Sequence, residues 1–251
     1  TDKAIRCVVR YLQELWRKNP HLPIYGGHYD VKKYFPSTPH SEIHALEQRR
    51  VTEPLFLPFL YDIVESQIDP RSQEDIDADP FGARGTGLGS QINQLVQIAL
   101  LDELDHEIKA ICPYYIRYND DFLVLSHDRA VIERAREIIR VRLSEKGLTM
   151  TDKRGVFTAD QGFYFMRKRY ILTHTGKIVI RLHKEALADE RHILRCLKSG
   201  VDRGLRTMDD VRRHYQSWVA MAEYCGDAPI RAMDKFYTDL FRSKPIYKRK
   251  K

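Results

Sequence analysis

The sequence predicts an α+β fold in which an antiparallel sheet with packed helices is followed by an all-helical end. Two short runs of aromatic and branched residues, 114–118 and 122–125, flank three residues that favour a tight turn, which indicates a β-hairpin. From residue 184 onward, apolar residues recur at helical spacing. We therefore expect two domains, a mixed one over 1–183 and a helical one over 184–251.

The elements of the first domain follow from periodicity and turn residues. A helix over 4–17 carries apolar residues on one face and ends before Pro20 and Pro23. The other elements expected there are an extended segment over 24–35 between glycines and prolines, helices over 41–67 broken near two prolines, a polar loop over 67–79, a helix after the glycines of 82–89, the hairpin of 114–126, a helix between an aspartate cap at 128 and a glycine at 147, and strands over 156–165 and 170–182.

The second domain is expected to contain three helices. Their apolar periodicity covers 184–197, 207–224 and 230–241. Thr207 and Asp210 have the spacing of a capping box at the start of the middle helix. Trp218 lies within that helix, and we expect it in the core.

Composition excludes several classes of protein. The 251 residues can bury a substantial core in one large domain or two small ones. A hydrophobic content of 43% and a charged content of 31% exclude a disordered or collagen-like chain. No apolar run reaches the roughly 18 to 20 residues that a membrane-spanning helix needs. The four cysteines are far apart and form no Cys-x-x-Cys pair, which argues against a disulfide scaffold or zinc ribbon and favours a reducing compartment.

Positive charge is concentrated towards the C-terminus. Residues 167–251 hold 21 lysines and arginines against 10 acidic residues, a net charge of +11, whereas residues 1–166 hold 21 against 25, a net charge of −4. A basic end on a slightly acidic body suggests a partner with a phosphate backbone. A basic surface that only favours solubility fits the charge about equally well.

Three aspartates fall where two predicted strand elements can bring them together. Asp30 follows the first extended run, and Asp120 and Asp121 lie at the tip of the hairpin. If the two elements are neighbours in one antiparallel sheet, Asp30 and Asp120 face each other about 5 Å apart. Two such carboxylates repel each other, and a divalent cation such as Mg²⁺ compensates them through oxygen ligands. Taken singly, each aspartate is also typical of an ordinary turn or strand end.

Four short segments occur in a fixed order along the chain. They are HYDVKKYFPS (28–37), GLGSQINQ (87–94), YNDD (118–121) and LTMTDK (148–153). Together they resemble the catalytic motifs of the bacterial reverse transcriptases of retrons, group II introns and diversity-generating retroelements. The resemblance extends over residues 1–240. It implies a polymerase palm over 1–183, which includes a helix at 1–19 next to the fingers, and a basic helical thumb and tail over 184–251.

The resemblance implies an RNA-directed DNA polymerase that transfers deoxynucleotides from dNTPs to a primer 3′-hydroxyl. Its cofactor would be two Mg²⁺ ions, or Mn²⁺ in their place. Asp30, Asp120 and Asp121 would be the catalytic residues; Asp30 and Asp120 would hold the metals, with Asp121 beside them and the main chain of Val31 facing them. The partners would be an RNA template and a DNA primer, with an accessory protein or structured RNA, in the bacterial cytoplasm.

The resemblance also assigns residues to the substrates. Phe35 would lie under the sugar and reject a 2′-hydroxyl group, and Lys153 would contact the triphosphate or protonate the leaving group. Gln91 and Gln94 would contact template or nucleotide, and Tyr118 would lie beside the primer end. Considered without the motifs, the same residues are typical of core packing, solvated side chains or helix-end polarity.

The sequence departs from the family pattern in three places. Phe165-Met166-Arg167 replaces a Phe-Leu-Gly that grips the primer in relatives, so that Arg167 would hold a phosphate instead. An aliphatic residue before Gly89 and a glutamine at 94 resemble the diversity-generating retroelement subgroup, whose enzymes copy adenines with errors. The fingers motifs are absent, and the chain begins without a methionine or signal peptide inside a helix-like pattern, so we expect an upstream portion.

The basic helical end is expected to follow a duplex backbone through salt-sensitive contacts that are independent of base sequence. The side chains that would make them are Arg191, Arg195, Lys198, Arg203, Arg206, Arg212 and Arg213.

Two alternatives remain open at this point. A template-independent or protein-primed polymerase, as in antiviral defence, would share the fold and the metal site. A nucleic-acid-binding palm without turnover belongs to a different class, although three crowded carboxylates without a metal argue against it.

Overall fold

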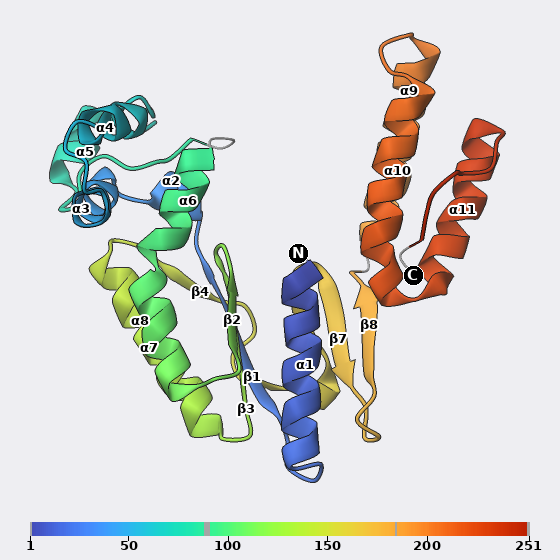
Figure 1. Ribbon diagram of the computed structural model, residues 1–251, viewed down its shortest axis with the longest axis horizontal. Helices are drawn as coiled ribbons and strands as arrows, with labels where there is room; N and C mark the ends of the chain where they lie inside the picture. The colour runs from blue at the N-terminus through green and yellow to red at the C-terminus, as the bar shows by residue number, and fades with distance from the viewer. Residues whose placement is uncertain (1, 88–90, 184, 250–251) are drawn as a thin grey trace. The chain divides into compact units, whose positions relative to one another are not determined.

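The structure is a computed structural model that describes residues 2–87, 91–183 and 185–249 (Figure 1). It divides into two compact units, 1–158 and 159–251. Each unit combines helices with an antiparallel sheet, so the predicted α+β class is confirmed. In the part of the chain that the structure describes, no helix is long and apolar enough to cross a membrane.

The first unit is built on a sheet with the strand order β2-β3-β1-β4, and β5 also pairs with β1. All of these pairings are antiparallel. Because the side chains of a strand alternate between the two faces, β1 buries Tyr29 and Val31 on one face. The strands are β1 (Tyr25–Val31), β2 (Tyr115–Tyr118), β3 (Asp121–Ser126), β4 (Met150–Asp152) and β5 (Phe157–Thr158).

Helices α7 (Asp102–Ile111) and α8 (Arg129–Glu145) lie side by side against this sheet (Figure 1). The hydroxyl group of Tyr29 donates a hydrogen bond to the carbonyl of Ile132 in α8 at 3.4 Å. As expected, the Asp128 side chain caps α8 by accepting a hydrogen bond from the Ala130 amide. The other helices of the unit are α1 (Asp2–Lys18), α2 (Tyr34–Ser37), α3 (His40–Arg50), α4 (Leu57–Glu65), α5 (Gln73–Ala78) and α6 (Gln91–Leu100).

Gly27 lies inside β1, where the strand runs very close to the residues beneath it. A β-carbon at Gly27 would come within 2.1 Å of the Tyr29 hydroxyl oxygen and 2.9 Å of an Ile132 methyl carbon. Glycine is therefore required here for close packing between strand and helix rather than for a turn.

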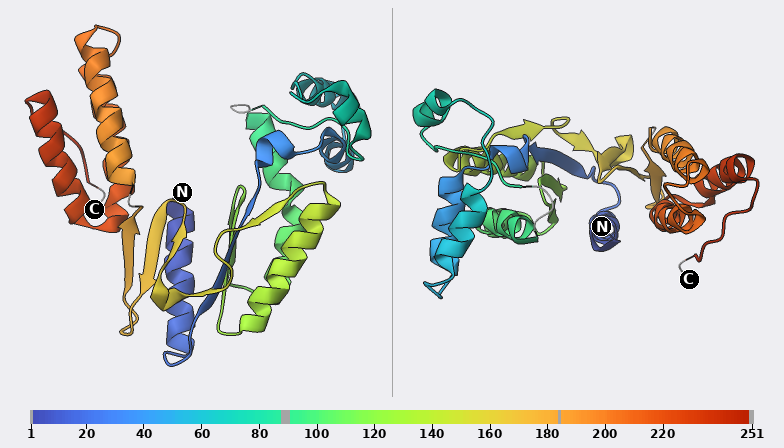
Figure 2. Two further views of the ribbon diagram at one scale, coloured as in Figure 1. Left: turned by 180° about the vertical axis from the view of Figure 1, so that it is seen from behind. Right: turned by 90° about the horizontal axis from the view of Figure 1, so that it is seen from above.

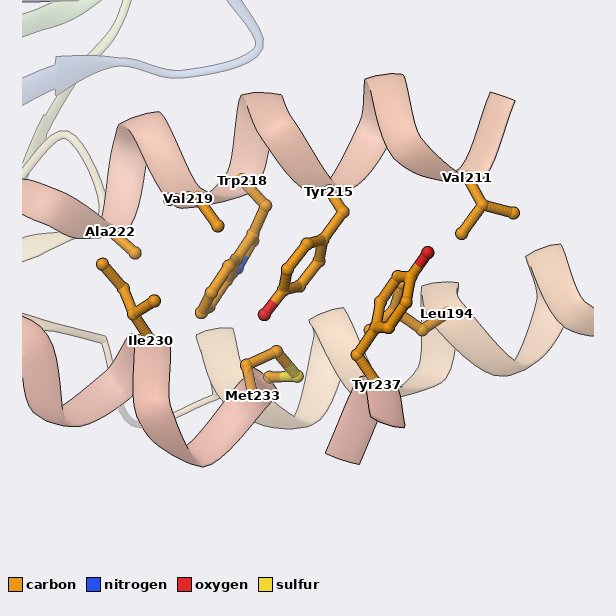
Figure 3. Close-up of a cluster of buried hydrophobic side chains, with 9 residues drawn as sticks. All are labelled: Leu194, Val211, Tyr215, Trp218, Val219, Ala222, Ile230, Met233 and Tyr237. Atoms are coloured by element: carbon orange, nitrogen blue, oxygen red, sulfur yellow. The ribbon is translucent and has the colours of Figure 1, made fainter. Parts of the chain in front are cut away.

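The second unit combines a three-stranded sheet with three helices that pack against one another, as the right view of Figure 2 shows. Its core is aromatic: the rings of Tyr215 and Trp218 stack with centroids 5.8 Å apart, and Tyr237 lies 4.8 Å from Tyr215 (Figure 3). Trp218 is 6% exposed, which confirms its predicted place in the core. The elements are β6 (Phe163–Phe165), β7 (Lys168–Leu172), β8 (Ile178–Leu182), α9 (Ala186–Asp202), α10 (Met208–Ala222) and α11 (Asp227–Phe241), with short 3-10 helices η1 (Ala159–Gln161) and η2 (Glu223–Cys225).

Several boundaries differ from the expected ones. The predicted loop over 67–79 contains α5, because the Ser72 side chain accepts a hydrogen bond from the Asp75 amide and starts a helix. The helix expected after the glycines is divided at Leu101 into α6 and α7. The strand expected over 156–165 is interrupted by η1. The expected capping box of Thr207 and Asp210 is present at the start of α10.

The division into units falls after Thr158, so β6, β7 and β8 belong to the same unit as the helical end. The sequence had placed these strands with the body, before residue 184. The assignment of palm and thumb to these parts stays a prediction. All four cysteines are free, in agreement with the expected absence of a disulfide scaffold.

Candidate functional site

The three predicted aspartates meet where β1 ends beside the β2–β3 hairpin. Asp30 lies directly opposite Asp121 in the antiparallel register of β1 and β3. The expectation that Asp120 would be the cross-strand partner is therefore wrong by one residue. The reason is local: β3 begins at Asp121, and the two-residue loop of the hairpin consists of Asn119 and Asp120.

The hairpin loop still brings Asp120 to the same place. Asn119 has a φ of 55°, a left-handed conformation that asparagine tolerates better than most residues. The chain then turns so that the Asp120 carbonyl accepts a hydrogen bond from the Val31 amide at 3.1 Å. This bond attaches the loop to the residue that follows Asp30.

The carboxyl groups of Asp30 and Asp120 interact directly. Burial raises the pKa of Asp120 above its usual value, and the negative charge of Asp30 raises it further, as does a hydrogen bond between the two groups. Asp121 adds a smaller repulsion in the same direction. The ionised form of the Asp120 carboxylate is therefore destabilised by burial and by the neighbouring aspartates.

Two basic side chains partner the other carboxylates. The Lys153 ammonium nitrogen lies 3.0 Å from Asp30 Oδ2, and the Lys153 amide donates to the His28 carbonyl at 3.0 Å. His28 Nε2 lies 3.1 Å from Asp121 Oδ1. His28 was not predicted as a site residue, although its position two residues before Asp30 places it on the same face of β1.

The carboxylates present suit a Mg²⁺ site that is completed by water and substrate, and not a site in which the protein supplies every ligand. Among the described residues, no group of three or more histidine, cysteine, aspartate or glutamate side chains converges on one point. Asp30 and Asp120 form an adjacent pair of oxygen donors, whereas Asp121 turns to His28. Mg²⁺ is typically bound by one or two carboxylates together with water and substrate phosphates, so such a pair suffices. Val31 contributes its amide to Asp120, and its side chain is buried.

Phe35 lies on α2, directly after the strand that carries Asp30. Its ring is partly buried and packs edge-on to Tyr34, with centroids 6.1 Å apart. Its carbonyl accepts a hydrogen bond from the Thr86 amide at 2.9 Å. The main chain of Phe35 is thus anchored to Thr86, and its ring packs against Tyr34.

The structure places the predicted glutamines and tyrosine on the surface. Gln91 and Gln94 are exposed on α6, and Tyr118 is 37% exposed at the end of β2. Gln97, which was not predicted, is buried instead and donates hydrogen bonds to Thr38 Oγ1 at 2.9 Å and Thr86 Oγ1 at 2.8 Å. The Leu88-Gly89-Ser90 part of the second motif lies outside the described residues.

A basic pocket opens beside Tyr118, between α1 and the edge strand β2. Its volume is about 540 Å³. The N-terminal half of α1 contributes most of its positive charge, and the described residues that line it include no acidic side chain. The lining residues are Lys3, Ala4, Arg6, Cys7, Arg10, Ile116, Arg117 and Tyr118.

Most of the predicted nucleic-acid-binding side chains in the second unit have partners within that unit. Arg191 and Arg195 lie over the ring of Phe236 at 5.8 and 5.2 Å. Three further side chains form ion pairs on their own helices: Lys198 with Asp202, Arg212 with Asp209, and Arg213 with Asp210.

Arg167 occupies a turn that favours glycine. Met166 and Arg167 form the two-residue loop between β6 and β7, and both have positive φ angles, of 50° and 60°. Glycine adopts positive φ without strain, so this turn is one in which a glycine would be favoured at position 167. The Arg167 side chain is exposed at the tip of the loop.

Comparisons with known proteins found similarity to solved structures only. No protein-family model matches the sequence, and no curated protein matches it at a significant level. The structure is similar to telomerase from Candida albicans in complex with a TWJ fragment of telomeric RNA, with 11% identity and a TM-score of 0.56 over 98% of this chain and 44% of that one. It is also similar to apo telomerase from Candida tropicalis, with 11% identity and a TM-score of 0.52 over 96% of this chain and 47% of that one.

A form of the Candida tropicalis enzyme truncated from its C-terminal domain matches with 10% identity and a TM-score of 0.52, over 71% of this chain and 39% of that one. The chain thus spans less than half the length of each of these telomerase chains. At such low identity the likeness shows the fold alone. The chain has a fold similar to part of these telomerase chains.

Proposed function

We propose that the chain is the polymerase portion of a reverse transcriptase of the bacterial type, which adds deoxynucleotides to a primer 3′-hydroxyl on an RNA template. The observation that carries the proposal is that strand pairing brings the three aspartates together on a reverse-transcriptase-like fold: Asp30 lies opposite Asp121, and the Val31 amide holds the Asp120 carbonyl. The strand and the hairpin loop that hold these residues belong to two segments, 28–37 and 118–121, that resemble catalytic motifs of that family.

Asp30 and Asp120 would hold the Mg²⁺ ions, with Asp121 beside them. When bound, the ions would activate the primer hydroxyl and neutralise charge on the leaving pyrophosphate. The protein contributes a rigid pair of carboxylates, because β1 fixes Asp30 and the Val31–Asp120 hydrogen bond fixes the loop. Positioning of this kind accounts for most of what a protein adds to phosphoryl transfer.

Other residues near the aspartates would select and orient the nucleotide. Lys153, which partners Asp30 in the free protein, would become available to the triphosphate once cations occupy the carboxylates. Phe35 would exclude a ribose 2′-hydroxyl with its ring, which packs against Tyr34, while the Thr86 amide anchors the Phe35 carbonyl. The assignment of Gln91, Gln94 and Tyr118 to template, nucleotide and primer remains part of the proposal.

The nucleic-acid strands would be held through their phosphates. In the first unit, the pocket beside Tyr118 presents Lys3, Arg6 and Arg10. In the second unit, Arg167 and the exposed arginines of α9 would supply further phosphate contacts. Such contacts are independent of base sequence and sensitive to salt.

The decisive experiment is Mg²⁺-dependent extension of a DNA primer on an RNA template, with Asp120→Ala beside the wild type. Asp62→Asn, an exposed aspartate of the same unit, is the control. We expect DNA synthesis to be lost in Asp120→Ala and retained in Asp62→Asn. When rNTPs are offered in place of dNTPs, we expect the wild type to incorporate little ribonucleotide. DNA synthesis by Asp120→Ala at the wild-type rate would refute the site. Because the chain spans less than half of the telomerase chains, the assay is made both on this chain and on an extended version that covers more of the fold.

One observation favours a second candidate, a nucleic-acid-binding module without turnover. Lys153 and His28 compensate Asp30 and Asp121 without any metal, so the cluster is not electrostatically untenable in a protein that makes no DNA. Retained duplex binding with no synthesis in the extended protein, whether or not a primer is present, would support this candidate. Synthesis without a template would indicate the template-independent or protein-primed polymerase instead.

A further inference from the structure

Arg117 is a buried arginine whose guanidinium group meets four acceptors. Its side chain, on β2, is only 5% exposed. Nε donates to Asp105 Oδ1 at 2.8 Å and Nη2 donates to Asp105 Oδ2 at 2.7 Å, which makes a bidentate ion pair with α7. Tyr115 also donates its hydroxyl to Asp105 Oδ1 at 2.6 Å, so the carboxylate is fixed from two neighbouring positions on β2.

The remaining donors of Arg117 reach the main chain. Nη2 donates to the Ile98 carbonyl in α6 at 2.8 Å, and Nη1 donates to the Asn119 carbonyl at 3.0 Å. The Asn119 carbonyl belongs to the peptide group that precedes Asp120. The peptide group that follows Asp120 is held as well, since its carbonyl accepts the Val31 amide. Both peptide groups that flank Asp120 are therefore fixed by hydrogen bonds.

We infer that Arg117 is a positioning residue that fixes the Asn119–Asp120 peptide and so holds the Asp120 carboxylate at its distance from Asp30. The inference rests on the proposed metal-binding role of Asp120. The Arg117 side chain donates its hydrogen bonds to Asp105 and to the Ile98 and Asn119 carbonyls, so its effect on Asp120 passes through the loop.

The loop needs such a restraint because of its conformation. Asn119 has positive φ, which costs free energy for a residue with a side chain, and two-residue loops relax when nothing holds them. The guanidinium group is planar, and the two bonds to Asp105 fix its orientation, so its remaining N–H groups point in set directions. A lysine at the same position has one flexible ammonium group and does not reproduce this fork.

The same arginine also links the loop to α6. Because Nη2 serves both Asp105 and the Ile98 carbonyl, α6, α7, β2 and the loop share one buried polar group. Gln91 and Gln94, which are expected to contact template or nucleotide, also lie on α6. Arg117 therefore holds both this helix and the loop that carries Asp120. Networks of this kind are sensitive to the loss of any one member.

The test uses Arg117→Lys and measures Mn²⁺ binding by electron paramagnetic resonance, together with hydrogen exchange of the Val31 amide. Tyr115→Phe is the matched control, because it removes a different hydrogen bond to Asp105 and leaves the Arg117–Asn119 bond in place. We expect Arg117→Lys to weaken Mn²⁺ binding at least about tenfold and to speed exchange at Val31. We expect Tyr115→Phe to lower the thermal midpoint while changing Mn²⁺ affinity less than about twofold.

A second variant covers the case in which Arg117→Lys does not fold. Arg117→Met combined with Asp105→Leu replaces the buried ion pair with apolar side chains, a change that often preserves or increases stability. A folded double variant is expected to lose Mn²⁺ affinity as Arg117→Lys does. Affinity and Val31 exchange equal to wild type in a folded variant without Arg117 would overturn the inference. Wild-type protein whose Mn²⁺ binding does not depend on Asp120 would instead overturn the proposed metal site.

Discussion

Lys153 lies with its ammonium nitrogen 3.0 Å from Oδ2 of Asp30, at the position where a metal ion would have to bind the same carboxylate. Lys153 directly follows β4, whose residues Met150–Asp152 pair with β1. Its amide is tied to the His28 carbonyl, so the residue is anchored while its side chain remains partly exposed. A metal ion bound at Asp30 would therefore compete with the Lys153 ammonium group for this carboxylate.

Lys153→Met should show this competition directly. Removal of the ammonium group should tighten Mg²⁺ binding by the free protein by about two- to fivefold, since partly exposed ion pairs contribute about 0.2–1 kcal/mol. If the lysine also serves the triphosphate, the rate of nucleotide addition should fall by about 10²-fold. Metal titration and single-turnover extension measure the two effects separately. Lys146→Met, which removes a similar pair with Glu42 at 3.2 Å, should alter neither.

Asp120 is expected to cost stability in the absence of metal. Burial and the charge of Asp30 raise its pKa above that of the unfolded chain, so the folded protein binds more protons between the two values. Stability is therefore greatest below the unfolded pKa and falls as pH rises through the folded pKa. Asp120→Asn removes this penalty and should raise the thermal midpoint by about 2 °C at pH 7, with a smaller gain at acidic pH.

Thermal unfolding in a chelating buffer across pH 4–8 makes that measurement. The exposed Asp62→Asn serves as the control and should show no gain at any pH. A midpoint of Asp120→Asn that is below wild type at pH 7, and not at acidic pH, would contradict the assigned direction of the pKa shift.

The sequence predicted the meeting of β1 with the hairpin but not its register. Periodicity and turn residues identify both elements, because strand alternation and an Asn-Asp loop are local features. Whether Asp120 or Asp121 opposes Asp30 depends on where the loop ends, and a shift of one residue moves a side chain to the other face. Only the paired structure decides that.

The residues that the sequence did not reveal are those whose partners are distant along the chain. In the sequence, Arg117 is typical of an ordinary strand residue, and no neighbouring residue in the chain indicates that it will bind the Asp105 carboxylate. His28 could have been anticipated from its spacing to Asp30, but its contact with Asp121 depends on the pairing of β1 with β3. Burial creates these roles, because a polar group removed from water must find a partner in the fold.

Phe35→Ala should relax the choice of sugar. If the ring occupies the space next to C2′ of the incoming nucleotide, its removal should raise ribonucleotide incorporation relative to deoxynucleotide by about 10- to 100-fold. Competition between rNTPs and dNTPs in primer extension gives the ratio. Phe59→Ala, which removes a ring that is 52% exposed on α4, is the control and should leave the ratio unchanged. An unaltered ratio in Phe35→Ala would assign the ring to packing against Tyr34 alone.

Arg195→Glu should weaken binding of an RNA–DNA duplex and flatten its dependence on salt. Arg195 is exposed on α9 and lies over the Phe236 ring, and it forms no ion pair with the residues that the structure describes, so its charge is available to a phosphate. Each phosphate contact contributes roughly one unit to the slope of log affinity against log salt, so the slope should fall by about one. Lys198 is already paired with Asp202 at 2.5 Å, and Lys198→Glu should have the smaller effect. Arg140→Glu, on α8 of the other unit, is the control; equal slopes for the Arg195 and Arg140 variants would mean that α9 does not face the duplex.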